Sequence, residues 1–291
     1  MFEYFIAQHK DEINLHMIEL IEAEDIPESL KESMIYSIEI GGKRLRPILV
    51  FAVLKALGRE LTLGYHTAAA LEMIHTYSLI HDDLPAMDND DLRRGKLTNH
   101  KVYGEAVAIL AGDGLLTHAF SLISLDGGLS FEQRIKLIQE LAQAAGPAGM
   151  IAGQVLDMEA ETKSVSLAEL KNIHAHKTGC LIEFAVIAGA IIGHAEAETL
   201  TGLRKFASHL GVAFQIRDDI LDIEGDSDLI GKTVGSDLAN NKTTYVSLTS
   251  LTEAKKMLEQ EIASAIESLK QLPFDTKLLE SITIFIKERQ H

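Results

Sequence analysis

The sequence has few of the residues that mark disulfides or domain boundaries, with 1 cysteine and 5 prolines among 291 residues. The lone Cys180 cannot form a disulfide within the chain. It lies in an apolar run, which predicts a buried, reduced thiol of the kind found in cytoplasmic proteins. No low-complexity or linker-like stretch interrupts the sequence. We therefore expect a cytoplasmic protein in which residues 1–291 form a single domain.

Positive charge is also scarce, with 27 Lys and Arg against 43 Asp and Glu and a formal net charge of −16. Because proteins that bind nucleic acid are normally basic, nucleic acid is not an expected partner. If this protein binds phosphates, local clusters of lysine and arginine must do so together with metal cations.

Signal-peptide and membrane-span patterns are missing as well. Residues 1–6 lack the basic region and the long apolar run of a signal peptide. The most apolar run, Leu181–Gly193, contains Glu183 and is shorter than the roughly 20 residues that a membrane span needs. It therefore predicts a buried helix, and we expect no stable membrane insertion.

Helical periodicity dominates the sequence, and the alternation of period two that is typical of strands is almost absent. Serine capping boxes at Ser130, Ser166 and Ser250 mark three helix starts. With 46% hydrophobic residues, the chain can fill a large core. We predict an all-α fold, a single large bundle of about eleven helices. The predicted helices cover about 2–24, 27–40, 44–57, 64–82, 104–125, 131–145, 148–161, 167–192, 196–224, 251–270 and 275–289.

An acidic stretch follows the apolar helical run 68–80. It contains Asp82, Asp83, Asp88, Asp90 and Asp91. Two carboxylates about 6 Å apart repel by roughly 3 kcal/mol at an effective dielectric constant of about 20, so a cation is expected among them. A solvated acidic turn is the alternative. A turn at Pro85 would bring Asp82 and Asp88 together, and hard oxygen ligands of this kind suit Mg²⁺.

A second acidic cluster, Asp218, Asp219 and Asp222, ends another long apolar helix. Asp218 and Asp222 are four residues apart and share a helix face with Gln215. The alternative is the polar stripe of an amphipathic helix.

Cations gather in several other motifs. The Gly41–Pro47 stretch places three cations at a helix start, where an anion is favoured, although a solvated helix cap is the alternative. Arg93 and Arg94 follow the acidic stretch and match phosphate geometry, or simply neutralise the neighbouring aspartates. Lys177-Thr178-Gly179 interrupts an apolar helix, and the segments 231–237 and 242–245 add two further lysines.

His75 by itself is more often a core or surface histidine than a ligand. Glu72-x-x-His75 matches half of a di-iron site, but the other such motif in the sequence lies at the extreme C-terminus, 288–291. We set the di-iron interpretation aside.

Together, the two aspartate-rich motifs, the Gly-Gly-Lys-Arg-x-Arg-Pro stretch and the Lys-Thr pair resemble the trans-prenyltransferases, the isoprenyl diphosphate synthases, in identity and order. The resemblance spans nearly the whole chain and is closest to the bacterial farnesyl diphosphate branch. It implies the isoprenoid synthase fold around a central cavity, and condensation of isopentenyl diphosphate with dimethylallyl and geranyl diphosphates to farnesyl diphosphate. A geranylgeranyl diphosphate synthase is the alternative within the family. The Gly41–Arg46 motif and the second aspartate motif argue against a terpene cyclase. The two complete aspartate motifs argue against a non-catalytic subunit.

The resemblance also implies roles for individual residues, a Mg²⁺ cofactor and a homodimer. The two motifs would hold the allylic diphosphate through Mg²⁺, and the Lys177 carbonyl and Thr178 hydroxyl would act catalytically by stabilising the allylic cation. Tyr77, with the two-residue insertion Pro85-Ala86, would limit the product to C15, although the helical wheel places Ser78 nearer the Asp82 face. The implied metal ligands are Asp82, Asp88 and Asp218, with Asp83, Asp219 and Asp222 close by. The allylic diphosphate would bind at Arg93, Lys177, Thr178, Gln215 and Lys232. Isopentenyl diphosphate would bind at Lys43, Arg46, His75 and Arg94.

Overall fold

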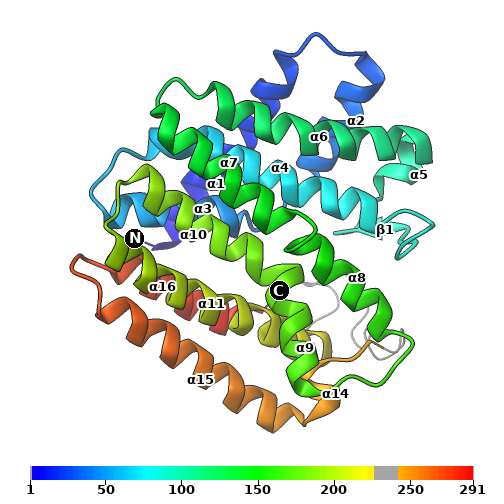
Figure 1. The fold of residues 1–291 in the computed structure, drawn as a ribbon. Helices are drawn as coiled ribbons and strands as arrows, with labels where there is room; N and C mark the ends of the chain where they lie inside the picture. Colours follow the sequence, from blue (N-terminus) through cyan, green and yellow to red (C-terminus); the bar gives the residue numbers. More distant parts are fainter. Residues whose placement is uncertain (1, 226–241, 291) are drawn as a thin grey trace. The chain divides into compact units, whose positions relative to one another are not determined.

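The computed structural model describes residues 2–225 and 242–290 and is all-α, as predicted (Figure 1). Within these ranges the strands are β1 (Leu92–Arg93) and β2 (Lys96–Leu97), which form one antiparallel hairpin. Lys232, predicted to bind the allylic diphosphate, lies outside the described residues. Chain contacts divide the protein into two compact units: unit 1 is Met1–Phe51 with Glu60–Ile138, and unit 2 is Ala52–Arg59 with Gln139–His291.

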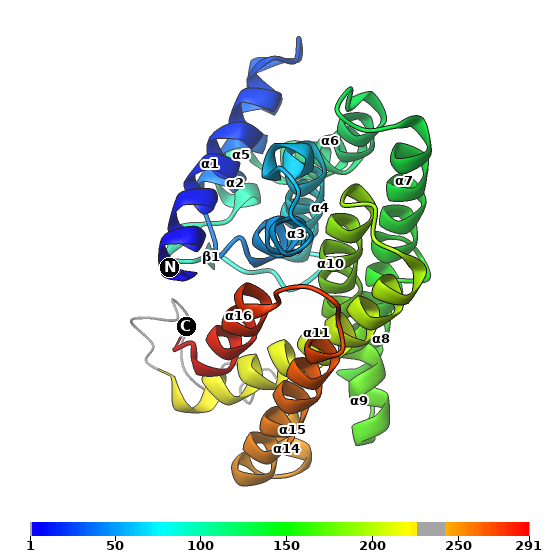
Figure 2. The same cartoon turned by 90° about the vertical axis from the view of Figure 1, so that its left-hand side faces the viewer.

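Unit 1 is built around α4 (Tyr65–Asp82), which packs along α6 (Glu105–Leu125) (Figure 2). Every residue of α4 from Thr67 to Ile74 is buried, so α4 is the core helix of this unit. Its other elements are α1 (Phe2–Glu22), α2 (Glu28–Glu39), the first part of α3 (Leu45–Ala56), the 3₁₀ turn η1 (Leu61–Gly64), α5 (Asn99–Tyr103) and the first part of α7 (Phe131–Ala145).

Unit 2 contains α11 (Ala197–Glu224), which packs against α10 (Cys180–Ile192) and α15 (Leu251–Lys270). In α10 every residue from Leu181 to Ile192 except Glu183 is buried, which confirms the predicted buried helix. An apolar cluster that includes Ile216, Ile220 and Met257 lies between α11 and α15. The remaining elements are the last parts of α3 and α7, α8 (Met150–Ala160), α9 (Leu167–His174), η2 (Ala175–Gly179), α14 (Tyr245–Leu248) and α16 (Lys277–Glu288).

Local signals placed most helix ends correctly. The Ser130 and Ser166 boxes form with both reciprocal hydrogen bonds, and the Ser250 hydroxyl accepts from the Glu253 amide at 3.1 Å. Pro27 is the N-cap of α2 rather than a residue of its first turn. The predicted helix 167–192 is interrupted by the π-helical turn η2, and the short elements η1, β1, β2, α5 and α14 were not predicted.

Within the part of the chain that the structure describes, two helical stretches, Glu105–Leu125 and Leu167–Ile192, are long and apolar enough to cross a membrane by length and composition. This is weak support for a span, because core helices of soluble proteins pass the same test. The second stretch is 61% buried within the protein, as a core helix is.

Candidate active site

The first aspartate motif forms a closed turn at the end of α4. The helix ends at Asp82, and the Asp88 amide donates to the Asp82 carbonyl at 2.8 Å. Asn89 has a positive φ of 53° and its amide donates to the Leu84 carbonyl, which completes the turn. The structure thus contains the predicted turn around Pro85 and brings the backbones of Asp82 and Asp88 together.

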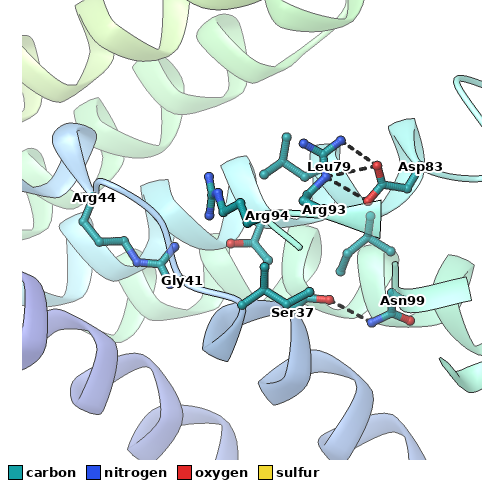
Figure 3. Close-up of a pocket in the computed structure, with 11 residues that line it drawn as sticks. Ser37, Gly41, Arg44, Leu79, Asp83, Arg93, Arg94 and Asn99 are labelled. Carbon is teal, nitrogen blue, oxygen red and sulfur yellow. Dashed lines mark hydrogen bonds and ion pairs between the residues drawn. The ribbon is translucent and has the colours of Figure 1, made fainter. Parts of the chain in front are cut away.

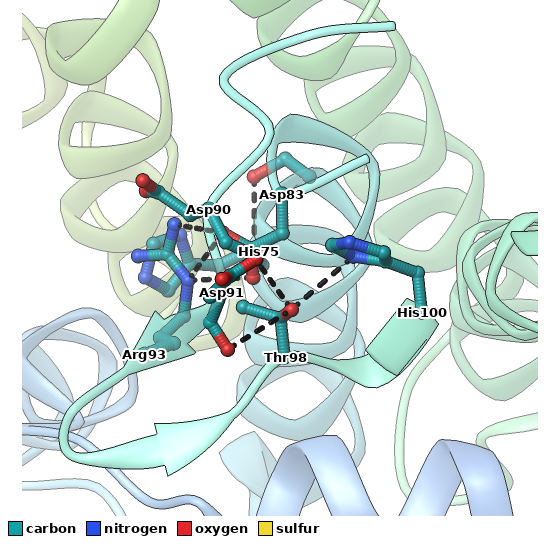
Figure 4. A network of polar contacts seen from close by, with 8 residues as sticks. His75, Asp83, Asp90, Asp91, Arg93, Thr98 and His100 are labelled. Carbon is teal, nitrogen blue, oxygen red and sulfur yellow. Dashed lines mark hydrogen bonds and ion pairs between the residues drawn. The ribbon is translucent and has the colours of Figure 1, made fainter. Parts of the chain in front are cut away.

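Asp83 differs from its neighbour because it is 3% exposed and bound to Arg93 (Figures 3 and 4). The Arg93 Nε donates to both carboxylate oxygens at 3.0 and 2.9 Å, and Nη2 donates to Oδ1 at 2.5 Å. Burial lowers the pKa of Arg93, but the hydrogen bonds and charge of Asp83 more than offset this, so the pKa lies above its ordinary value. The ion pair therefore holds the β1–β2 hairpin against the end of α4.

The last two aspartates of the stretch fix the loop that follows them (Figure 4). The Thr98 hydroxyl donates to the Asp90 carbonyl at 2.7 Å, and the Thr98 amide donates to the Asp91 carbonyl at 3.0 Å. The exposed Asp91 carboxylate pairs with Lys101 at 2.7 Å, and this hydrogen bond and charge lower its pKa. The cation beside Asp91 is thus Lys101, whereas Arg93 pairs with Asp83.

The hairpin turn aims Arg94 at the glycine-rich loop before α3. Arg94 and Gly95 both have positive φ, 54° and 76°, as a two-residue hairpin turn requires. A Cβ atom on Gly42 would lie 2.4 Å from Nη1 of Arg94, so only glycine allows this approach. Two motifs about fifty residues apart in sequence thereby meet in unit 1.

Arg44, in the same loop, is a structural residue. It is 3% exposed, and its guanidinium donates to Glu72 Oε1 at 2.8 Å, to Asn14 Oδ1 at 2.6 Å and to the Ile38 carbonyl at 2.6 Å. The Arg44–Glu72 pair ties the loop to α4. It engages Oε1 of the Glu72 carboxylate.

His75 on α4 lies close enough to Arg44, Arg46, Arg93 and Arg94 to feel their positive charge. Burial lowers its pKa well below the usual value, and the charges of Arg46, Arg94, Arg44 and Arg93 lower it further, so the imidazole is neutral at pH 7. Burial, followed by the neighbouring arginines, also lowers the pKa of Arg94 to about 10, at which it stays charged. Arg44, Gly41, Arg93 and Arg94 line a small pocket (Figure 3). Guanidinium groups this close repel one another, so an anion bound among them is stabilised.

In unit 2, the π-helical turn η2 carries the Lys-Thr pair. Lys177 Nζ contacts Asp157 Oδ2 of α8 at 2.6 Å. A Cβ atom on Gly153 would lie 2.1 Å from the Lys177 amide nitrogen, so this glycine lets α8 reach the turn. Asp157 is a site residue that the sequence reasoning missed. Its sequence signal was weak, because Asp157 is one of several acids near the end of α8, where Glu159 and Glu161 follow it.

Thr178 begins a chain of hydrogen bonds toward the second aspartate motif. Its hydroxyl donates to Gln215 Oε1 at 3.2 Å, and the Gln215 amide donates to Asp219 Oδ1 at 3.1 Å. Asp219 is 3% exposed and accepts from the Tyr245 amide through Oδ2 at 2.8 Å. Gln215 thus contacts Asp219, although the helical face predicted for it was that of Asp218.

Asp218 is half-exposed and forms an ion pair with Arg289 Nη2 at 2.6 Å. The Arg289 side chain is buried, lies 4.2 Å over the Phe214 ring and donates to the Phe214 carbonyl at 2.9 Å. The nearby Lys287 does not share this partner, since its Nζ pairs with Glu259 Oε1 at 2.7 Å. The sequence reasoning assigned no role to Arg289, because its partner lies 71 residues away.

A model of the polyprenyl synthetase family matches residues 27–277. The chain belongs to the polyprenyl synthetase family. It is 53% identical over 291 residues to the farnesyl diphosphate synthase of Geobacillus stearothermophilus (99% of this chain, 98% of that protein) and 53% identical over 289 residues to that of Bacillus subtilis (99% and 98%). A solved geranylgeranyl pyrophosphate synthetase from Pyrococcus horikoshii superposes with a TM-score of 0.89 at 31% identity, over 99% of both chains. The predicted family of trans-prenyltransferases is confirmed.

Polyprenyl synthetases depend on Mg²⁺, and the residues present here fit such an ion. Asp82, Asp88 and Asp218 offer only hard oxygen donors, and the turn at Pro85 brings the first two together along the backbone. Within residues 2–225 and 242–290, no group of three or more His, Cys, Asp or Glu is arranged to hold a metal alone. Mg²⁺ needs no such group, because one or two carboxylates, waters and substrate phosphates complete its coordination.

Proposed function

We propose that this polyprenyl synthetase is a farnesyl diphosphate synthase, which adds isopentenyl diphosphate first to dimethylallyl and then to geranyl diphosphate. The observation that carries the proposal is the arginine-rich cluster of unit 1, where the Gly42 loop, Arg94 and the neutral His75 are gathered. In this cluster Glu72 pairs with Arg44, and Asp83 pairs with Arg93. Arg94, which stays charged, adds positive charge that can bind an anion. Such a site suits a diphosphate.

Isopentenyl diphosphate binds at Lys43, Arg46, His75 and Arg94 in this proposal. The arginines supply fixed positive charge, and the neutral imidazole supplies one N–H donor. Because the Arg94 guanidinium lies against Gly42, the hairpin and the loop act as one binding element in this proposal.

The allylic diphosphate binds at Arg93, Lys177, Thr178, Gln215 and Lys232, with Asp82, Asp88 and Asp218 as the metal ligands. Mg²⁺, when bound, supplies positive charge to the departing diphosphate. Lys177, held by Asp157, adds a fixed cation for the same leaving group, while its carbonyl and the Thr178 hydroxyl stabilise the allylic cation. The released diphosphate accepts the proton that the new alkene loses, so the reaction needs no separate side-chain base.

Tyr77 sets the product length in this proposal. Its side chain is 5% exposed and lies on α4 five residues before Asp82. Burial, together with the charge of Asp82, raises the pKa of Tyr77 to about 12, so the ring remains an uncharged obstacle for a growing isoprenoid chain.

The enzyme also works as a homodimer in the cytoplasm, with units 1 and 2 parts of one catalytic domain. The dimer is supported by α5 and α6, where Val102, Ile109 and Leu110 are 43%, 43% and 58% exposed. Neighbouring exposed apolar side chains of this kind typically mark an interface.

The test is product analysis with purified protein, Mg²⁺, isopentenyl diphosphate and geranyl diphosphate. We expect farnesyl diphosphate, detected as farnesol after phosphatase treatment. Geranylgeraniol as the main product, or a hydrocarbon formed from the allylic diphosphate alone, would overturn the proposal. Asp218→Ala should cut turnover by about 100-fold or more, because a metal ligand is lost.

A further inference from the structure

His81, in the last turn of α4, lies where α4 meets α6. Its Nε2 lies 3.0 Å from the Ile109 carbonyl of α6, which fixes this nitrogen as the donor. Asp113 Oδ1, one turn along α6, lies 4.0 Å from the same nitrogen. The imidazole is therefore held on α6 by a hydrogen bond, although it belongs to α4.

Gly112 makes this contact possible. A Cβ atom at position 112 would lie 2.1 Å from Nε2 of His81 and 2.5 Å from Cδ2. No side chain fits at this distance, so the imidazole lies directly against the α6 backbone. Gly112 is itself buried, so the ring fills the space that a side chain would otherwise take.

The same ring also contacts Tyr77. Residues 77 and 81 are one helical turn apart, and their rings meet edge to face with centroids 5.7 Å apart and planes at 78°. Tyr77 is thus packed against a ring that α6 holds in place. Because the His81 side chain is 28% exposed, loss of the imidazole would leave open space beside Tyr77 into which the phenol ring can turn.

We propose that His81 is a positioning residue for product length. It holds the Tyr77 ring across the path of the growing chain, and Gly112 and the Ile109 carbonyl hold His81. This inference rests on the proposed function, in which Tyr77 limits the product.

The test compares product lengths of folded variants. His81→Ala should raise the ratio of C20 to C15 products at least fivefold, because Tyr77 loses its support. Gly112→Ala should do the same, since the new methyl group displaces the imidazole. Gly114→Ala is the matched control. It makes the same substitution on the same helix, but its Cβ meets only the flexible Met34 thioether at 3.3 Å, so we expect the unmodified ratio.

Two further variants separate the ring from the hydrogen bond. His81→Phe keeps an aromatic ring beside Tyr77 and should keep the short product, whereas His81→Gln keeps a donor toward Ile109 and should lengthen it. His81→Ala combined with Tyr77→Ala should give the product distribution of Tyr77→Ala alone, because His81 acts through Tyr77. A purely structural histidine would lower the melting temperature without this pattern.

Unchanged product length in folded His81→Ala and Gly112→Ala would overturn the inference. If His81→Ala failed to fold, His81→Gln would be judged by the same criterion. The unmodified enzyme tests the proposed function separately. If it made a product other than C15, farnesyl diphosphate synthesis would be rejected, while lengthening of that product in His81→Ala would still support the role of His81.

Discussion

Two adjacent aspartates in each acidic motif have different environments. Asp83 and Asp219 are both 3% exposed and are held by internal hydrogen bonds, one from Arg93 and the other from Gln215 and the Tyr245 backbone. Asp82 and Asp218, which precede them, are only half-buried. In both motifs, therefore, the second aspartate supports the fold, and the first is better placed to meet a ligand.

This difference predicts separate effects of two isosteric substitutions. Asp83→Asn should lower the free energy of unfolding by about 2–3 kcal/mol, because the partly buried Arg93 loses its charged partner. Asp82→Asn should leave the free energy of unfolding nearly unchanged and cut kcat about 100-fold or more. Urea unfolding and steady-state kinetics measure both quantities. An Asp83→Asn variant as stable as the unmodified enzyme would contradict this assignment.

The buried His174 predicts how stability depends on pH. Burial lowers its pKa to about 4, and its ring packs against Tyr245 at 5.4 Å. The unfolded chain takes up this proton near pH 6.5 while the folded protein does not, so stability present above that pH is lost as the pH falls toward 4. His174→Phe should reduce the loss of unfolding free energy between pH 7 and pH 5 by about 2 kcal/mol, measured by urea titration at each pH. An identical pH slope in both proteins would rule out this role.

At the scale of elements, the Gly42 loop and the β1–β2 hairpin meet where Arg94 lies over the glycine. Gly42→Ala should displace Arg94 and raise KM for isopentenyl diphosphate about tenfold or more, with a smaller effect on KM for geranyl diphosphate. Gly58→Ala is the control, because Gly58 also has a positive φ, 67°, but nothing lies within 4 Å of its added Cβ. Equal effects of both substitutions would mean that backbone strain, rather than Arg94, is responsible.

The segment after α16 is held by the Arg289 side chain. Arg289→Ala should lower the free energy of unfolding by about 1–3 kcal/mol, because a charge-assisted hydrogen bond to Phe214 and the contact with its ring are lost along with the Asp218 pair. Lys287→Ala removes a more exposed pair with Glu259 and should change stability little. Hydrogen exchange of α16 in the two variants measures the difference. Equal protection in both would contradict it.

Elements were predictable from the sequence where their signals lie within a few neighbouring residues, and not where they depend on contacts between distant residues. Serine capping boxes and apolar periodicity are local, so the starts at Ser130, Ser166 and Ser250 agree with the structure. The hairpin was missed because strands of two residues are too short to show alternation. The partners of Asp83 and Lys177 were missed because only the tertiary fold brings Arg93 and Asp157 to them.

At the scale of the whole molecule, the chain carries a net charge of −16, yet four arginines (Arg44, Arg46, Arg93 and Arg94) gather around His75, where a diphosphate is proposed to bind. The surface also keeps exposed apolar residues on α5 and α6. An acidic protein repels its own copies, so a pairing through α6 must depend on apolar contact.

This predicts the behaviour of one surface substitution. Leu110→Glu should convert the proposed homodimer into a monomer at micromolar concentration, because a charge is placed on an apolar interface. Light scattering coupled to gel filtration gives the mass. Leu15→Glu, which alters an equally exposed leucine (58%) on α1, is the control and should remain dimeric. If the unmodified enzyme were itself a monomer, the proposed homodimer would be wrong.

The π-helical turn Ala175–Gly179 affects how the chain can change in length at this point. A π turn holds about one residue more than an α turn, so deletion of one residue there would let the turn become α-helical and leave α9 and α10 nearly in phase. The buried face of α10 would keep its core contacts, whereas Lys177 would be displaced from Asp157. The extra residue of this turn thus serves the placement of the Lys-Thr pair rather than the packing of α10.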